Sequence, residues 1–267
     1  MNAPSPERRR IAIGVEYDGT GLFGWQSQKD GPSVQGALEA ALSRVADEAV
    51  QVVGAGRTDA GVHASGQVAH FDTLALRSPR AWVLGANSAL PAGVCIRWAR
   101  EAPPGFHARF SALARSYSYL VINREARSAL WRDRAWWVHR PLDEALMHAA
   151  GQALVGVHDF SAFRAAECQS KTARRRIERL SVTRRGEFLR LDVTADAFLH
   201  HMVRNIAGTL AAVGRGARPE AWVGDVLAGG ERCRAGATAP AAGLYLVRVD
   251  YGELLPTPPV DRPGPPG

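Results

Sequence analysis

The sequence predicts an α+β protein with two ferredoxin-like (βαββαβ) halves, joined around a mainly antiparallel central sheet with a cleft between them. Strand-like and helix-like segments follow one another in the order β-α-β-β-α-β over residues 11–104, and a comparable order returns over residues 105–252. The chain has 267 residues, and a hydrophobic content of 46% suffices for a core of that size. The halves share little residue identity, so the expected duplication concerns the order of elements alone.

The first half is expected to carry two helices between its strands. A strand-like run at 11–18 precedes a helix that follows Ser33, a typical N-cap residue. The apolar residues that recur at helical spacing in this helix are Val34, Ala37, Leu38, Ala41, Leu42 and Val45. The remaining segments of the half are strands at 50–54 and 66–72, a helix opened by Pro79, and a strand at 94–100.

The second half is expected to repeat this order. A hairpin turns at Arg185-Gly186, between two segments in which apolar and polar residues alternate. The other expected segments are strands at 115–122 and 243–251 and helices at 142–156, 200–214 and 219–229. Residues 1–10 and 253–267 are expected to be a disordered tail and a tail too rich in proline to pack.

The charge of the chain favours an anionic partner. The net charge is +7 and the isoelectric point is about 9.9, which suits nucleic-acid binding. Of the 33 lysines and arginines, however, only Lys29 and Lys171 are lysines. A GC-rich genome also enriches a protein in Arg, Ala and Gly, so composition alone leaves anion binding and genome bias as equal alternatives.

The cysteines and the N-terminus indicate a protein of the reducing cytosol. Cys95, Cys168 and Cys233 are odd in number and far apart, so neither a disulfide framework nor a zinc site is expected. The first ten residues lack the apolar stretch of a signal peptide, and no apolar run reaches the length of a membrane span. We therefore expect a cytoplasmic location without membrane attachment.

The segment GAGRTDAGVHASGQVAHF, residues 54–71, combines four glycines with Arg57 and Asp59. It contains neither a G-K-[ST] sequence nor a G-x-G-x-x-G fingerprint after a first strand, which argues against nucleotide binding. An aspartate in such a segment is most often a turn residue. The other interpretation is a loop that presents an ionised, nucleophilic carboxylate beside an arginine, with glycines that let a bulky substrate approach. The residues alone leave both open.

The same segment resembles the signature loop of the TruA family of tRNA pseudouridine synthases. Other segments resemble that family in the same order along the chain, namely EYDGTGLFGWQ (16–26), FHARFSALARSYSYLV (106–121), DFSAFRA (159–165), FLHHMVRNI (198–206) and AGLYLVRVDY (242–251). The resemblance covers residues 11–251. It implies an isomerase that needs no metal or organic cofactor and converts uridine to pseudouridine at tRNA positions 38, 39 and 40.

The resemblance implies four residues at the reacting uridine. Asp59 is the expected nucleophile, by attack on C1′ or C6 or through proton abstraction from the sugar. Tyr117 is expected to stack on the base and to accept the C5 proton, with Tyr119 as a structural tyrosine on the same face. Arg204 is expected to pair with Asp59, and Leu244 to lie beneath the ring. From the pattern alone, Tyr117 is better interpreted as an edge or core aromatic. Arg204 has the alternative of an exposed helix arginine, and Leu244 that of a core strand leucine.

The resemblance also implies contacts with tRNA. A stacked uridine must be flipped out of its stem, and Arg57 is the expected wedge. The segments similar to RNA-contacting parts of the family comprise Phe106, His107, Ala108, Arg109, Phe110, Glu167, Cys168, Gln169, Ser170 and Lys171. A run of basic residues follows, namely Arg174, Arg175, Arg176 and Arg179. It is either a stripe that binds phosphates or a solvated charge run. Glu125 stands where a basic residue is expected, and Arg124 and Arg127 flank it.

The expected partners are tRNA and a second copy of the chain. A metal is not expected, because His200 and His201 would point in different directions on a helix and no carboxylate or cysteine lies at ligand spacing. Two other functions remain as alternatives. One is a non-catalytic tRNA-binding protein or chaperone on the same scaffold, and the other is a metal-dependent nucleic-acid hydrolase, which the lack of a carboxylate cluster disfavours.

Overall fold

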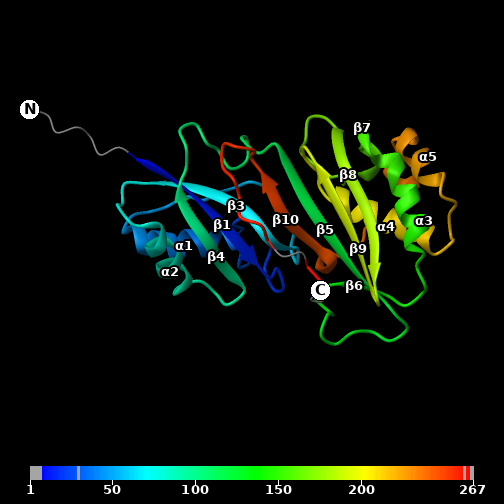
Figure 1. Cartoon of the computed structure of the whole chain (residues 1–267), viewed down its shortest axis with the longest axis horizontal. Helices are drawn as coiled ribbons and strands as arrows, with labels where there is room; N and C mark the ends of the chain where they lie inside the picture. The colour runs from blue at the N-terminus through cyan, green and yellow to red at the C-terminus, as the bar shows by residue number, and fades with distance from the viewer. Residues whose placement is uncertain (1–7, 29–30, 261–262, 265–267) are drawn as a thin grey trace, which may run out of the picture. The chain divides into compact units, whose positions relative to one another are not determined.

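The computed structural model describes residues 8–28, 31–260, 263 and 264 (Figure 1). The chain divides into two compact units, residues 1–113 with 246–261 and residues 114–245 with 262–267. Both units combine helices with strands that pair mainly antiparallel, which confirms the predicted α+β class. In the described part of the chain, no helix has both the length and the apolar character needed to cross a membrane.

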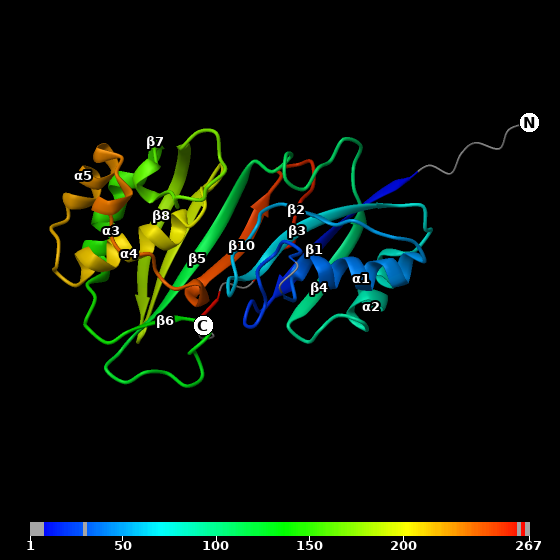
Figure 2. The same ribbon diagram turned by 180° about the vertical axis from the view of Figure 1, so that it is seen from behind.

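The first unit has a sheet with two helices on one face, as Figure 2 shows. Its elements are β1 (Arg9–Tyr17), α1 (Val34–Ala46), β2 (Val53–Gly54), β3 (His63–Thr73), α2 (Pro79–Asn87), β4 (Val94–Glu101) and most of β10 (Leu244–Asp250). The strand order is β4-β1-β3-β10, and β2 pairs with β3. Strand β1 is antiparallel to both of its neighbours. The expected order of strands and helices over residues 11–104 is therefore present.

Both helices of the first unit begin where the sequence predicts. The side chain of Ser33 accepts a hydrogen bond from the N–H of Gly36, and Ser78 does the same for Ala81 ahead of Pro79. The buried residues of α1 are Val34, Leu38, Ala41, Leu42 and Ala46, close to the predicted apolar face. These local signals suffice because capping and helical spacing act within a few residues.

The division between the units differs from the expected boundary at 104/105. Residues 105–113 belong to the first unit, where Leu113 N–H donates to the Asp250 carbonyl at 2.8 Å. Strand β10, expected in the second half, groups with the first unit from Leu246 onward. Spatial neighbours, which a linear pattern does not contain, decide both assignments.

The tails are shorter than predicted. Arg9 and Arg10 are already part of β1, while residues 1–7 lie outside the described residues. The expectation that 253–267 stays unpacked is wrong for 253–260. Leu255 is buried, and the Pro256 carbonyl accepts a hydrogen bond from Arg100 Nη1 at 2.9 Å. Thr257 and its neighbours up to Val260 line a cavity of about 150 Å³ against β1, β3 and β10.

The second unit has its own strands and helices. They are β5 (Ala114–Asn123), β6 (Trp136–Val138), α3 (Glu144–Gly151), β7 (Gly156–Asp159), β8 (Arg174–Arg185), β9 (Phe188–Ala195), α4 (Met202–Gly214) and α5 (Trp222–Gly229). Short 3₁₀ helices cover Gln152–Leu154, Ser161–Phe163, Arg232–Arg234 and Ala241–Gly243. The strand order is β5-β9-β8-β7, all antiparallel, with β6 parallel to β5.

The second unit confirms the predicted hairpin and corrects the predicted helices. Strands β8 and β9 turn at Gly186, whose φ is +56°, a conformation that glycine adopts without strain. The helix expected over 142–156 is shorter, and the one expected from residue 200 begins at Met202. Strands β6 and β7 were not predicted, because three or four residues contain too little periodicity to identify a strand.

Candidate active site

The residues between β2 and β3, 55–62, form what we call the Asp59 loop. Its first residues are anchored to β3: Ala55 N–H donates to the Val68 carbonyl at 2.8 Å, and Gln67 Nε2 donates to the Gly56 carbonyl at 2.8 Å. Gln67 is fully buried and so fixes the loop from beneath. The loop is therefore a rigid connection rather than a free turn.

Two glycines here serve the packing of the protein itself. A Cβ on Gly54 would lie 2.5 Å from the indole ring of Trp25, and Gly61 has a φ of +76°. The sequence interpretation assigned the glycines to the approach of a substrate. At these two positions the structure gives an internal reason instead, which depends on a tertiary contact and a backbone angle.

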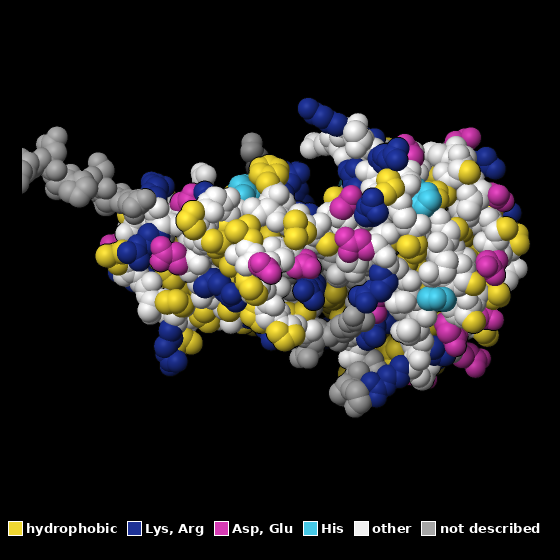
Figure 3. All heavy atoms as spheres, turned by 45° about the horizontal axis from the view of Figure 1, so that its top comes forward, with side chains coloured by type: hydrophobic (Ala, Val, Ile, Leu, Met, Phe, Trp, Pro, Cys, Tyr) yellow, Lys and Arg dark blue, Asp and Glu magenta, His cyan; other side chains and the backbone are white. Residues whose placement is uncertain are grey.

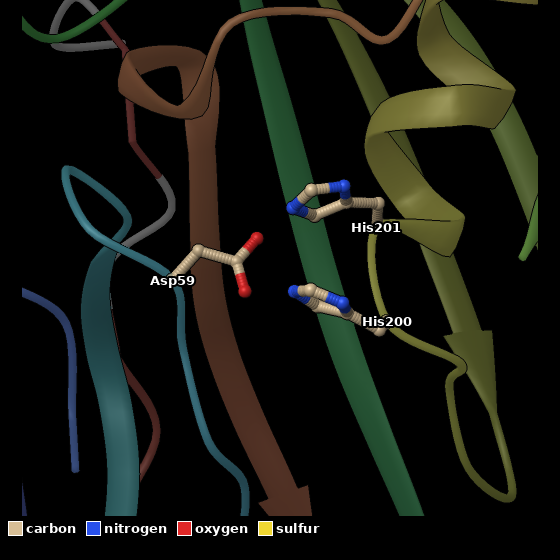
Figure 4. Close-up of side chains that lie close together, drawn as sticks. All are labelled: Asp59, His200 and His201. Atoms are coloured by element: carbon tan, nitrogen blue, oxygen red, sulfur yellow. The ribbon is translucent and has the colours of Figure 1, made fainter. Parts of the chain in front are cut away.

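Asp59 lies half-buried in a loop whose residues Thr58 and Val62 are buried. Thr58 and Val62 are 7% and 1% exposed, and the Asp59 carbonyl accepts a hydrogen bond from Val62 N–H at 3.1 Å. Figure 4 shows the carboxylate projecting from the loop ahead of β3. Arg57, two residues earlier, is exposed. The first unit thus presents a partly accessible carboxylate, together with the exposed Arg57, from an anchored loop.

Tyr117 and Tyr119 share strand β5 in the second unit but have different surroundings. The ring of Tyr117 is 8% exposed and meets Phe198 edge-on, with centroids 5.0 Å apart. The hydroxyl of Tyr119 donates to the Pro240 carbonyl at 2.7 Å, and burial raises its pKa well above the ordinary value. Tyr119 is therefore structural, as expected. Phe198 is a residue that the sequence reasoning missed, although it lies within a motif quoted for the resemblance.

Arg204 projects from the first turn of α4 and is held by the segment before β10. Its Nε donates to the Ala239 carbonyl at 2.8 Å, and the Ala239 N–H donates back to the Arg204 carbonyl at 3.1 Å. The side chain is half-buried rather than a freely exposed helix arginine. Leu244, the first residue of β10, is 7% exposed. Arg204 is thus hydrogen-bonded to the segment that leads into β10, five residues before Leu244.

The contact that holds Arg204 depends on Gly208, one turn further along α4. A Cβ on Gly208 would collide with the Ala237 carbonyl oxygen. We expect Gly208→Ala to lower the free energy of unfolding by about 3 kcal/mol, since the backbone of the packed segment must move. Gly224→Ala in α5 is the matched control, because its new Cβ would meet only the Ala153 Cβ at 3.9 Å. That variant should be neutral or stabilised by about 0.5–1 kcal/mol in urea unfolding. Equal stability of both variants would contradict the prediction.

His200 and His201 precede α4 instead of lying on it, as Figure 4 shows. His201 has a φ of +61°, unusual for a residue other than glycine, and its ring lies 4.0 Å from that of His200. Helical directions therefore do not separate the two rings, and that reason for expecting no metal is wrong. The expected absence of a metal stays a prediction.

The segment Phe106–Phe110 in the first unit is only partly available to RNA. Phe106 and Ala108 are fully buried, and Phe106 packs against Tyr251 with ring centroids 5.0 Å apart. The prediction that their side chains contact tRNA is therefore wrong. Arg109 and Phe110 are exposed, Phe110 by 77%. His107 stacks on Phe110 at 4.3 Å, which leaves an exposed aromatic and basic pair.

The segment from Glu167 to Arg176 in the second unit divides in the same way. Glu167, Gln169, Lys171, Arg174 and Arg176 are exposed, with Ser170 half-buried. Arg175 instead turns back, and its guanidinium donates to Ser170 Oγ at 2.5 Å and to the Arg174 carbonyl at 2.6 Å. The stripe of phosphate contacts predicted from 174–176 therefore lacks Arg175, because alternate residues of a strand face opposite sides.

Cys168 is nearly buried, so its side chain offers little surface to tRNA, contrary to the prediction. Burial alone would raise the pKa of the Cys168 thiol, but hydrogen bonds from the backbone of His200 and Ser170, together with Arg164, lower it overall. The thiol is thus held by its surroundings rather than presented outward.

Arg124, beside Glu125, makes contacts within the protein. Its guanidinium pairs with Glu187 at 3.0 Å and donates to the carbonyls of Ala126 and Arg127. Arg127 is exposed.

On the face drawn in Figure 3, basic side chains alternate with acidic ones rather than forming one patch. Positive charge on this face is therefore presented at separate points.

Comparison with known proteins gives the class to which these features belong. Residues 13–111 and 150–252 match the family model described as tRNA pseudouridine synthase, so the chain belongs to that family. It is 53% identical over 249 residues to tRNA pseudouridine synthase A of Aeromonas salmonicida, covering 93% of each chain. It is 56% identical over 248 residues to tRNA pseudouridine synthase A of Stenotrophomonas maltophilia, covering 92% of this chain and 95% of the relative. The resemblance inferred from the motifs is confirmed.

Proposed function

We propose that this chain isomerises uridine to pseudouridine at positions 38, 39 and 40 of the tRNA anticodon stem-loop. The single observation that carries the proposal is Asp59, a partly accessible carboxylate on an anchored loop within the matched family region. We further propose that the enzyme works in the cytoplasm as a homodimer. The relatives named tRNA pseudouridine synthase A support the reaction and the substrate class.

The reaction explains the residue types. The bond between uracil N1 and ribose C1′ breaks, the base turns, and a bond forms between C5 and C1′; a proton leaves C5 and one is gained at N1. Asp59 is the proposed nucleophile, and Arg204 is proposed to pair with its carboxylate. Tyr117 is proposed to stack on the base and to accept the C5 proton, and Leu244 to support the ring. Because no electrons are lost or gained overall, the isomerisation needs no redox cofactor.

We also propose the finer architecture expected from the sequence, two ferredoxin-like halves around a cleft. In the first unit, the element order β1-α1-β2-β3-α2-β4 and the neighbouring strands β4, β1, β3 and β2 support it. The second unit supports it less directly, because β6 and β7 interrupt the expected order.

Mapping of modified positions tests the proposed function. The protein is incubated with unmodified tRNA transcripts that carry uridine at 38, 39 or 40, and pseudouridine is located by chemical labelling. We expect product at these positions and no shortening of the RNA. Binding without product would favour a non-catalytic tRNA-binding protein, and shortened RNA would favour a hydrolase.

Arg57→Ala is expected to slow modification more than it weakens binding. The exposed side chain of Arg57 precedes Thr58 and is proposed to fill the space that the flipped uridine leaves, which costs a few kcal/mol of stacking. We expect a loss of about tenfold or more in the single-turnover rate and about threefold or less in affinity. Arg44→Ala, an exposed arginine on α1, is the control and should change neither. Equal losses in rate and affinity would indicate a simple phosphate contact.

A further inference from the structure

The segment from Tyr17 to Trp25, which we call the collar, holds the Asp59 loop at its centre. Trp25 N–H donates to the Thr58 carbonyl at 3.0 Å. The hydroxyl of Tyr17 lies 2.8 Å from Thr58 Oγ1 in a buried hydrogen bond. Thr58, the residue directly before Asp59, is therefore bonded to the collar through both its backbone carbonyl and its side chain.

Glycines bring the collar and the Asp59 loop into backbone contact. A Cβ on Gly24 would collide with the Thr58 carbonyl oxygen and lie 2.9 Å from the carbonyl carbon of Asp59. A Cβ on Gly19 would collide with the carbonyl oxygen of Val62 at the end of the loop. Main chain thus packs on main chain along the loop, so a shift of the collar is transmitted to the loop directly.

The Tyr17–Thr58 hydrogen bond fixes the backbone at Thr58. Tyr17 is 3% exposed and Thr58 is 7% exposed. Rotation of Thr58 would leave a buried hydroxyl without its Tyr17 partner, which costs roughly 1–3 kcal/mol. The Thr58 side chain therefore has one favoured position. Because this position fixes the backbone at Thr58, it also fixes the direction in which the side chain of the next residue, Asp59, projects.

We propose that Tyr17 is a positioning residue for the reaction, acting on Asp59 through Thr58. The inference rests on the proposed role of Asp59 as nucleophile. The Tyr17 hydroxyl holds Thr58, and Thr58 sets the direction of the Asp59 side chain. A displacement of about 1 Å at a reacting group lowers turnover about 100-fold, so a loosened Thr58 is costly for catalysis even in a folded enzyme.

A purely structural role for Tyr17 predicts a different result. Its ring also packs near Trp25, with centroids 6.2 Å apart and planes tilted by 43°. Tyr17→Phe keeps that ring and removes only the hydroxyl. A structural tyrosine would lose stability on this change and keep its turnover, whereas a positioning residue loses turnover at a temperature where the variant is fully folded.

The test compares turnover, affinity and stability in the full-length enzyme. Tyr17→Phe is expected to lower kcat about 10–100-fold on unmodified tRNA transcript, with KM and tRNA affinity within about threefold. Tyr245→Phe is the matched control, because its hydroxyl donates to the Arg134 carbonyl at 2.6 Å, within the second unit. It should retain wild-type kcat. A Tyr17→Phe enzyme with wild-type kcat overturns the inference.

Variants of Thr58 test the same hydrogen bond from its other side. Thr58→Ser keeps a hydroxyl and should retain most of the turnover, while Thr58→Val should be as slow as Tyr17→Phe. The double variant with Tyr17→Phe and Thr58→Val should be no slower than the slower single variant, since both remove one interaction. Additive losses, or equal rates for Thr58→Ser and Thr58→Val, overturn the inference even if Tyr17→Phe does not fold. Absence of pseudouridine with the wild-type enzyme would instead overturn the proposed function.

Discussion

Asp59→Asn is expected to abolish pseudouridine formation while tRNA affinity stays within about threefold. The amide has nearly the shape of the carboxylate, but it carries no charge and is a poor nucleophile. We expect the single-turnover rate to fall by at least about 1000-fold, the scale of loss seen when a nucleophile is removed. The rate is measured with excess enzyme on unmodified transcript, and affinity by filter binding. Asp59→Ala should behave alike.

The control for this substitution is Asp47→Asn. Asp47 is exposed at the end of α1 with a φ of +57°, a conformation that asparagine also tolerates. The same change of carboxylate to amide is therefore made in the same unit without altering the Asp59 loop. If Asp59→Asn formed product at near the wild-type rate, the nucleophile would have to be another residue. If it lost affinity as much as rate, Asp59 would serve binding.

Local signals in the sequence predicted the local parts of the fold. Ser33 caps α1 and Gly186 turns the β8–β9 hairpin, because a cap or a turn depends on a few adjacent residues. The packing of Leu255 was not predicted. Proline excludes helix and interior strand, but it does not prevent an extended chain from lying on a sheet. That outcome depends on the surface the segment meets.

The sequence predicted which segments form the candidate site better than which side chains are accessible. The motif containing Asp59 was recognised from its letters, and the structure adds the collar that holds it. The inward orientation of Arg175 could have been predicted from the sequence, because side chains alternate between the two faces of a strand along 174–176. The burial of Phe106 could not have been predicted, since Phe106 packs against Tyr251, which is far away in the chain. Accessibility is a tertiary property, and a motif contains only part of it.

We expect the stability of the protein to depend on pH through His70, whose imidazole is hydrogen-bonded to the segment that contains Arg109 and Phe110. His70 is 3% exposed in β3, and its Nδ1 accepts a hydrogen bond from Ala108 N–H at 3.1 Å, which requires this nitrogen to be unprotonated. Burial, followed by the nearby charges of Arg10 and His107, lowers the pKa of His70 to about 4, although Asp72 acts in the opposite direction. Folding therefore favours the neutral form.

The sign of the pH effect follows from these pKa values. The pKa of an unfolded histidine is 6.5, so between pH 6.5 and about 4 the unfolded chain binds more protons at His70 than the folded protein does. The stability contributed by neutral His70 is complete above pH 6.5, declines as the pH falls through that interval, and declines no further below about 4. The full difference corresponds to about 3 kcal/mol.

His70→Asn should reduce this loss of stability in acid. The Asn Oδ1 takes the place of Nδ1 as acceptor for the Ala108 N–H but does not titrate. Between pH 7 and 4.5, we expect the wild-type protein to lose about 2–3 kcal/mol more unfolding free energy than His70→Asn, measured with urea. His139→Asn, at an exposed histidine, should follow the wild-type protein. The Asp72–Arg10 ion pair is present in all three proteins. The charge of His70 also lowers the pKa of Asp72, so the difference between the curves reports His70 together with its effect on this neighbour. Parallel curves for wild type and His70→Asn would mean that His70 takes up its proton over the same pH range in the folded and unfolded states, and that the Ala108 hydrogen bond does not hold the neutral form.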